Sequence, residues 1–311
     1  MCSTYLRGFP MRTTALRAAL ATNCVFSAFT GLSILVFPEG VASWIEFSYV
    51  AVLQIVGALL VLFAALLLYA IWPGGNPQPI ALLASLGDFG WVVGTVALGV
   101  FAPGLLSSFG WGVATVVALI VLTCGIWQVV GINLSYRDKS RPGWVRLCIE
   151  TQMDVSPAAV WQVVSDLEAI ADHSPQLASS LLVGTADETG RVMRECRDTS
   201  GKCWTEHIQL DQDGMQLNAE FDTQKPGFPF PFAQMHGGWQ IDPSQDGATV
   251  KVWWSMIPRS RMFALFFLPV LDVSIRRSFR GTLANIRNVA SGEQLNAKDT
   301  RQAGRLQMAV C

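Results

Sequence analysis

Hydrophobic residues are distributed very unevenly along this chain of 311 residues. Four apolar runs, near residues 18–37, 48–72, 79–101 and 110–133, are each long enough to cross a bilayer, which takes about 20 helical residues. The stretches "FPEG", "WPGGNPQP" and "APGLLSSFG" separate them. Because these connections are short, we expect consecutive helices to be antiparallel neighbours in a four-helix transmembrane domain, residues 1–135.

Basic residues around the four runs predict their orientation, because cytoplasmic loops carry an excess of Lys and Arg. The flanking bases are Arg7, Arg12 and Arg17 on the N-terminal side, and Arg137, Lys139, Arg141 and Arg146 on the C-terminal side. The first loop has Glu39 and Glu46 but no base. We therefore expect a multi-pass protein of the bacterial inner (cytoplasmic) membrane with both termini in the cytoplasm. A cleaved signal peptide ending near "AALA" is the alternative, but it would conflict with this charge distribution.

One acidic residue, Asp88, lies inside the third apolar run, and Asn23, Gln54 and Gln128 are polar positions of the other three. A carboxylate at mid-membrane costs about 2.5–3.5 kcal/mol on insertion scales, so Asp88 should face the interior of the helical domain. No run contains a basic partner. This favours a hydrogen-bonded carboxyl that fixes helix packing over a proton or ligand site. The same helices could also form a homo-oligomer.

After a polar linker, residues 136–143, the pattern changes to alternation between apolar and polar positions, which predicts a strand over 145–153. "VSPAAVWQVVSDLEAIADHSP" then predicts two short helices, the first capped by Ser156 and beginning at Pro157. Six more strands are expected near residues 178–184, 190–197, 203–210, 215–223, 234–242 and 248–257. A long helix over 260–290 and a polar tail over 291–311 complete the chain.

This order, together with "CWTE" and "FPFPFAQMHGGW", resembles the polyketide cyclase/dehydrase and lipid transport group of the SRPBCC (START-like, Bet v 1-like) helix-grip superfamily. The resemblance covers residues 144–290. It implies an α+β domain in which a seven-stranded antiparallel sheet curls around the long C-terminal helix and encloses an apolar cavity. The α-helical four-span half resembles small DoxX-like bacterial membrane modules, but only in its number of spans and its general apolar character.

Strand alternation and helical spacing select the residues that would bind a ligand in such a cavity. Gly237 at an inward position would leave room where a packed core needs volume. The expected ligand-binding residues are Trp161, Trp204, Glu206, Phe221, Met235, Gly237, Trp239, Trp254, Leu268 and Leu271.

Two residues are candidates for acid/base chemistry. Glu206 shares the inward face with Trp204, so it could bind a ligand hydroxyl or transfer a proton, or it could pair with an arginine such as Arg194. His173 follows the second short helix and could reach the cavity mouth or cap that helix. The seven cysteines form no metal-ligand or paired spacing, so we expect no metal, no cofactor and no disulfide framework.

Three functions fit these expectations, and a net charge of -1 without a basic block makes nucleic acid an unsuitable partner for any of them. The favoured one is a membrane-tethered START-like domain that binds or transfers a lipid, quinone or polyketide-like ligand at the cytoplasmic membrane face. The apolar stretch 262–275, with Arg259, Arg261, Arg276 and Arg277 near its ends, would touch the bilayer. The alternatives are a polyketide cyclase/dehydratase-type enzyme and a membrane-anchored sensor or assembly module.

Overall fold

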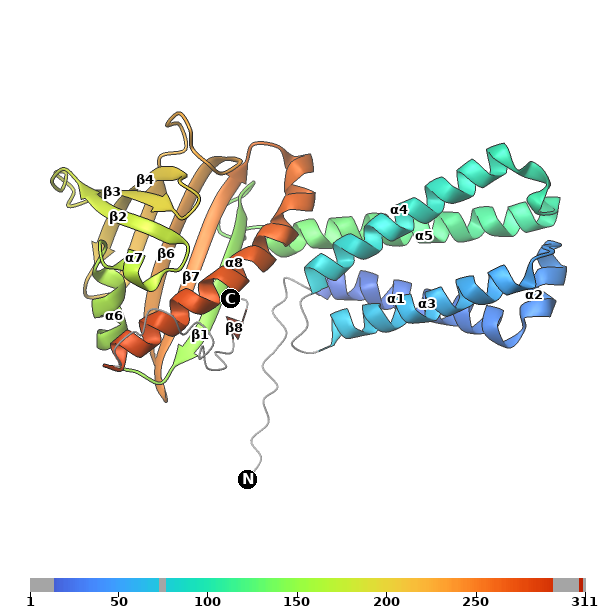
Figure 1. Ribbon diagram of the computed structural model, residues 1–311, viewed down its shortest axis with the longest axis horizontal. Coiled ribbons are helices and arrows are strands. Elements are labelled where there is room, and N and C mark those ends of the chain that lie inside the picture. The colour runs from blue at the N-terminus through green and yellow to red at the C-terminus, as the bar shows by residue number, and fades with distance from the viewer. Residues whose placement is uncertain (1–13, 73–76, 293–307, 310–311) are drawn as a thin grey trace, which may run out of the picture. The chain divides into compact units, whose positions relative to one another are not determined.

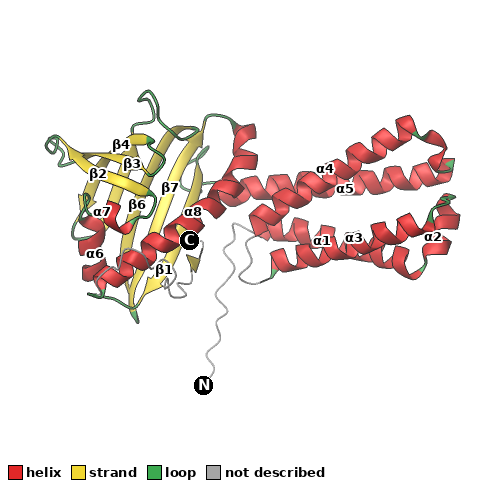
Figure 2. Cartoon of the chain, viewed as in Figure 1, coloured by secondary structure: helices red, strands yellow, loops and turns green. Residues whose placement is uncertain are grey.

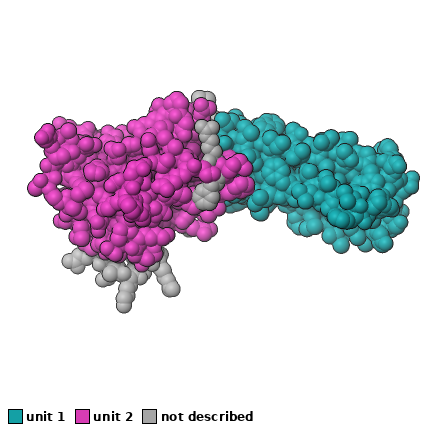
Figure 3. Space-filling view, turned by 90° about the horizontal axis from the view of Figure 1, so that it is seen from above, with its two compact units in different colours: residues 1–135 teal, residues 136–311 magenta. Residues whose placement is uncertain are grey.

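The computed structural model describes residues 14–72, 77–292 and 308–309 of the chain. The chain divides into two compact units, Met1–Ser135 and Tyr136–Cys311, which Figure 3 distinguishes by colour. Each unit has its own architecture and is described separately. The N-terminal bases Arg7 and Arg12 lie outside the described residues.

The first unit contains four helices that are long and apolar enough to cross a membrane, which confirms the four predicted runs (Figure 1). They are α1 (Thr14–Val36), α3 (Val50–Ile71), α4 (Pro77–Phe101) and α5 (Ser108–Tyr136). The connection between the first two was expected to be a short loop, but it forms a further helix, α2 (Pro38–Ile45). Pro38 suits a first helical position, and Glu46 ends the helix in the left-handed conformation (φ 53°). A turn of 3-10 helix, η2 (Pro103–Leu105), precedes α5.

The interior of this unit holds a hydrogen-bonded polar cluster centred on Asp88. Oδ2 of Asp88 accepts hydrogen bonds from Nδ2 of Asn23 (2.9 Å) and Nε2 of Gln128 (3.1 Å). Oδ1 of Asn23 and Oε1 of Gln128 in turn accept from the hydroxyls of Ser27 (3.1 Å) and Ser85 (3.2 Å). All five side chains are buried, and together they link α1, α4 and α5.

The contacts of Asp88 agree with the hydrogen-bonded carboxyl expected from the sequence, because its partners are neutral amides. Gln54, the fourth polar position, is exposed on α3 and takes no part in the cluster. Close packing of α1 against α3 depends on glycine instead: a Cβ on Gly31 would lie 2.8 Å from the carbonyl oxygen of Gly57.

The second unit is an antiparallel sheet crossed by a long helix, which confirms the predicted helix-grip architecture (Figures 1 and 2). The strands are β1 (Val145–Met153), β2 (Leu177–Val183), β3 (Val192–Asp198), β4 (Cys203–Asp211), β5 (Gln216–Phe221), β6 (Phe232–Ser244), β7 (Gly247–Pro258) and β8 (Met308–Ala309), and their order in the sheet is β2-β3-β4-β5-β6-β7-β1-β8. The helices are α6 (Pro157–Ser165), α7 (Ile170–His173) and α8 (Arg261–Ala290).

Two segments that the sequence presented as polar connections are part of this unit. Two residues of the predicted tail form β8, an eighth strand that pairs with β1 at Glu150 and Thr151. Two residues of the predicted linker bond to the rest of the unit. The hydroxyl of Tyr136 donates to Asp272 (3.3 Å), and Asp138 accepts from the hydroxyl of Ser255 (2.7 Å). Sequence polarity alone could not reveal these contacts, because each partner lies more than a hundred residues away.

Local sequence explains how α6 begins. The side chain of Ser156 accepts a hydrogen bond from the backbone N–H of Ala159 (3.2 Å), and Pro157 occupies the first helical position, as predicted. Helix α8 continues through Pro269, which is buried inside it.

Gly238 on β6 is required by close packing between strands, so we predict that Gly238→Ala destabilises the second unit. A Cβ there would lie 2.5 Å from the carbonyl oxygen of Leu217 and 2.8 Å from the indole of Trp253. The expected loss is about 1–3 kcal/mol, as for other overpacked sites. The matched control is Gly281→Ala in α8, where the new Cβ would meet Pro175 at an ordinary 3.4 Å and the helix gains from alanine. Thermal unfolding of the two variants measures the difference; equal melting temperatures would contradict the packing argument.

Candidate functional site

A cavity of about 410 Å³ lies between the sheet and α8 in the second unit. Most of its wall comes from inward positions of β3 to β7, from the "FPFP" loop and from α8. The apolar lining residues are Val164, Ile170, Leu177, Leu217, Ala219, Phe221, Phe230, Phe232, Met235, Trp204, Trp239, Val252, Trp254, Met256, Leu271, Ile275 and Phe279. The polar ones are Ser174, Gln176, Arg194, Cys196, Asp198, Glu206, Ser274, Ser278 and Thr282.

Aromatic rings shape the apolar part of the cavity. The ring of Phe279 on α8 packs edge-on against Trp254 (4.8 Å between centroids) and also contacts Trp239 (6.1 Å). At the "FPFP" loop, Phe230 packs edge-on against Trp204 (5.6 Å). Gly237 lies between Phe221 and Trp254, each 3.2 Å from where its Cβ would be, so a larger residue would take up cavity space.

The charged part of the wall is a pair of neighbouring residues on β3 and β4. Nη2 of Arg194 lies 2.5 Å from Oε2 of Glu206, and the indole N–H of Trp204 donates to Oε1 (2.6 Å). Burial is the largest single influence on the pKa of Arg194 and would lower it, but the charges of Glu206 and Cys196 and the hydrogen bond to Glu206 together raise that pKa. Both oxygens of Glu206 are therefore engaged, which matches the arginine-paired alternative given for this residue.

The expected ligand-binding residues divide into two groups in the structure. Eight of them line the cavity: Trp204, Glu206, Phe221, Met235, Gly237, Trp239, Trp254 and Leu271. Trp161 and Leu268 are buried but do not line it. The indole of Trp161 donates to Gln212 (2.6 Å), and Leu268 lies one turn before Leu271, where the lining part of α8 begins.

Helix α8 also contributes three hydroxyl-bearing residues that the sequence analysis missed. Ser274, Ser278 and Thr282 line the cavity at i, i+4 and i+8. Each precedes an apolar residue of α8, and two of these residues, Ile275 and Phe279, line the cavity as well. The buried face of a helix is wider than one row of side chains, so the residues directly before the apolar row could also have been expected at the cavity.

His173 and Glu206 are not brought together around the cavity. His173 is buried and does not line the cavity; its Nδ1 has no hydrogen-bond partner, and its backbone oxygen accepts from Asn285 (3.0 Å). Its neighbour Ser174 lines the cavity instead. An acid/base pair built from these two residues is thus not assembled in this structure.

Two of the four arginines expected to meet lipid headgroups form ion pairs or hydrogen bonds within the second unit. Arg276 pairs with Asp272 (2.8 Å), a carboxyl whose pKa is raised by burial. The guanidinium of Arg259 donates to the backbone oxygens of Phe232 and Thr223 (3.2 Å each) and so holds the "FPFP" loop against the start of α8. Arg277 is exposed, and the side chain of Arg261 lies outside the described residues.

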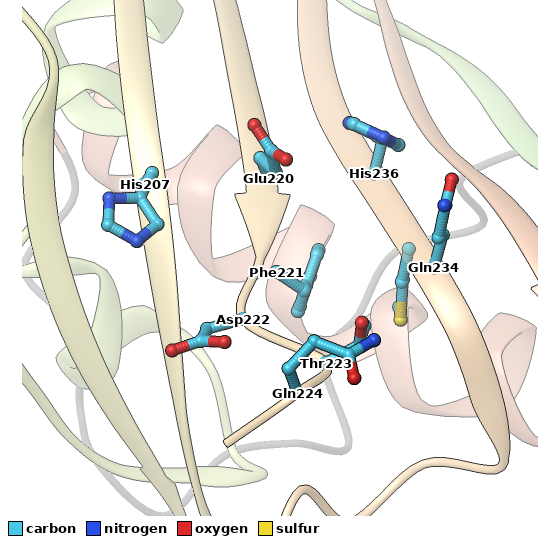
Figure 4. A pocket seen from close by; sticks show the side chains of 9 residues that line it. His207, Glu220, Phe221, Asp222, Thr223, Gln224, Gln234 and His236 are labelled. Atoms are coloured by element: carbon cyan, nitrogen blue, oxygen red, sulfur yellow. The ribbon is translucent and has the colours of Figure 1, made fainter.

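A second, polar hollow of about 330 Å³ lies on the outer face of the sheet (Figure 4). His207, Glu220 and His236 occupy neighbouring register positions on β4, β5 and β6 there. Burial, followed by the charge of Arg141, lowers the pKa of His236. Glu220 is exposed and lies 3.7 Å from Arg191. Within the described part of the chain no group of three or more His, Cys, Asp or Glu side chains could hold a metal ion.

The cysteines differ from one another more than their scattered positions suggested. Cys148 on β1 is disulfide-bonded, which the sequence analysis did not predict. Cys24, Cys124, Cys196 and Cys203 are free. Burial raises the pKa of Cys196, which lines the cavity, to about 12. Its thiol therefore stays protonated at neutral pH and is a poor nucleophile.

Residues 146–291 match the family described as polyketide cyclase/dehydrase and lipid transport. The family resemblance of the second unit is thereby confirmed. This match and the apolar cavity indicate a domain that binds hydrophobic ligands. Comparison with curated proteins found no match.

Solved structures that resemble the chain cover about half of it and nearly all of their own length. The Zhui aromatase/cyclase from Streptomyces sp. R1128 is 13% identical (50% of this chain, 97% of that chain, TM-score 0.38). A START superfamily protein from Mycobacterium smegmatis is 12% identical (48% and 97%, TM-score 0.37). A protein from Thermus thermophilus is 16% identical (47% and 97%, TM-score 0.38).

The raised pKa and burial of Cys196 predict that alkylating reagents do not reach it in the folded chain. At pH 8, iodoacetamide should modify the half-buried Cys203 at least about 100-fold faster than Cys196, because only thiolates react. Peptide mass spectrometry after timed labelling gives the two rates, and labelling in denaturant shows that both thiols are reactive once exposed. Equal rates in the folded chain would contradict the assigned environment of Cys196.

Proposed function

We propose that this protein is a membrane-tethered START-like domain that binds a hydrophobic molecule in the cavity between its sheet and α8, and exchanges it with the cytoplasmic face of the membrane. The observation that carries the proposal is the cavity itself. Its volume of about 410 Å³ falls within the roughly 300–1,000 Å³ typical of small-molecule sites, and its lining is mostly aromatic and aliphatic. One lipid chain, quinone or polyketide-sized molecule suits such a space.

The four apolar helices support the tether. A binding domain attached to a bilayer meets membrane-dissolved molecules at a high effective concentration, without first having to find the membrane. The basic residues Arg137, Lys139, Arg141 and Arg146 after α5 favour the cytoplasmic side for the second unit.

The exposed face of α8 offers a surface through which exchange with lipid could take place. Met262, Phe266 and Val270 have exposed fractions of 69%, 46% and 59%. At about 100° per residue, they share an arc of about 80° with the exposed Arg277 and Arg280 further along the helix. An apolar stretch continued by arginines suits a bilayer surface, where rings and aliphatic chains enter the acyl boundary and guanidinium groups meet phosphates. Ser274, one turn after Val270 and about 40° beyond this arc, is exposed and also lines the cavity.

The cyclase or dehydratase alternative finds less support. It would use Glu206 and His173 as proton donor and acceptor, but Glu206 is already bonded through both oxygens and His173 does not line the cavity.

Filling the cavity should abolish ligand binding, and Ser278→Trp on α8 is the suitable change, because the side chain of Ser278 is half-buried and faces the cavity. Native mass spectrometry of the full-length chain, followed by solvent extraction, should detect a co-purifying hydrophobic molecule that is lost at least about tenfold in the variant. The control is Ser291→Trp, which adds the same side chain at an exposed position just after α8. Equal ligand content in both variants would contradict the proposal, provided that both melt like the unmodified chain.

If α8 touches the bilayer, a fluorescent amino acid placed at Phe266 should be quenched by brominated lipids in vesicles that contain the full-length chain. The same label at Ser291, exposed beyond the end of α8, serves as the control and should be quenched several-fold less. Equal, weak quenching at both positions would show that this face stays in water.

A further inference from the structure

The charged groups of the cavity wall restrict the charge of the ligand. Among the described residues that line the cavity, Arg194 is the one cation, while Glu206 and Asp198 are acids. The sum is one negative charge. Because Glu206 already neutralises Arg194 at 2.5 Å, no free cation faces an entering anion. Burying a carboxylate without such a partner is strongly unfavourable.

The pair is also fixed in place. The side chains of Arg194 and Glu206 are only 10% and 5% exposed, and the indole N–H of Trp204 holds the second carboxylate oxygen. Nε of Arg194 is buried and has no hydrogen-bond partner, so Glu206 is the acceptor that the structure gives this guanidinium. Opening this pair to bind an anionic ligand would leave Glu206 uncompensated in an apolar wall.

Within the cavity lining, α8 contributes hydroxyl groups and no charged side chain. Ser274, Ser278 and Thr282 form a row at helical spacing beside the apolar row of Leu271, Ile275 and Phe279. The hydroxyl of Thr282 donates to Ser174 (3.2 Å). The hydroxyls of Ser274 and Ser278 bond to no group in the described part of the chain.

Neither hydroxyl uses the carbonyl four residues earlier, which is a frequent partner of helical serines. Ser33 and Ser85 of this same chain do so, at 2.8 Å each. The two hydroxyls of α8 are thus available to donate to, or accept from, oxygen atoms of a ligand.

From these observations we infer that the cavity takes an uncharged amphiphile: a largely apolar skeleton that carries hydroxyl or carbonyl oxygens along one edge. The carboxylate form of the same skeleton is rejected. This inference rests on the proposed function and adds the chemical class of the ligand to it. The oxygens would face Ser274 and Ser278, and the apolar skeleton would lie against Trp239, Trp254 and Phe279.

The test compares two photoreactive probes, hexadecanol and palmitic acid bearing the same diazirine, on the full-length chain in lipid nanodiscs. After irradiation, mass spectrometry measures the labelling of cavity peptides from β6 and α8. Labelling of α3 (Val50–Ile71) serves as the internal reference, because it reports how much of each probe the bilayer holds. The expected ratio of alcohol to acid labelling is at least about tenfold higher in the cavity peptides than in α3.

Variants identify the charge that is responsible. Glu206→Gln frees the cation of Arg194, so labelling by the acid should rise several-fold while labelling by the alcohol stays the same. Asp198 also lines the cavity, but its Oδ1 accepts from Ser200 and from the backbone N–H of Lys202, and the charge of Lys202 acts on it. Asp198→Asn should therefore raise acid labelling less; it serves as the second variant if Glu206→Gln does not fold. The matched control is Asp242→Asn, which removes the partner of Lys251 (2.9 Å) outside the cavity lining and should leave both ratios unchanged.

The outcomes separate this inference from the proposed function. Cavity labelling by both probes in the same ratio as α3 would overturn the charge selection but leave a hydrophobic-ligand cavity. An alcohol-to-acid labelling ratio that is lower in the cavity peptides than in α3 would also overturn the charge selection, and it would assign Arg194 to anion binding. Labelling of α3 without any labelling of the cavity peptides would overturn the proposed function together with this inference.

Discussion

The second unit depends on one constraint: a curved antiparallel sheet can be covered by a single helix only along part of its concave face. Helix α8 provides that cover, and Phe279 fixes it by packing against Trp239 and Trp254. Where the helix does not fill the curve, the inward positions of β3 to β7 line a cavity. Gly237 maintains this space, because its missing Cβ would already touch Phe221 and Trp254.

Polar groups at the wall of this cavity are satisfied by one another, and that limits what they can do chemically. Glu206 holds Arg194 and Trp204, so it serves as a fixed part of the wall and not as a free acid. The same principle operates in the first unit, where Asp88 is satisfied by Asn23 and Gln128. In both places a carboxyl group is kept in an apolar setting by donors from neighbouring elements, which specifies how those elements pack.

Much of this organisation could be predicted from the sequence, because periodicity reports directly on burial. The four apolar runs, the seven main strands and α8 follow from it, and strand alternation together with helical spacing placed eight of the ten expected ligand-binding residues at the cavity. Other features depend on contacts between distant residues and left no local signal. Trp161 has a helical position like that of a lining residue, but Gln212 holds its indole elsewhere. The strand β8 and the contact of Tyr136 with Asp272 are of the same kind.

The central claim is that the space between the sheet and α8 is a ligand site and not a gap that side chains fill. Electron cryomicroscopy of the full-length chain, purified in nanodiscs made from its host membrane, tests this most directly. The account predicts non-protein density along α8 that contacts Trp254 and Phe279 and reaches Ser278. A cavity closed by the rings of Trp239 and Trp254, with no such density, would contradict the account and favour the sensor or assembly module.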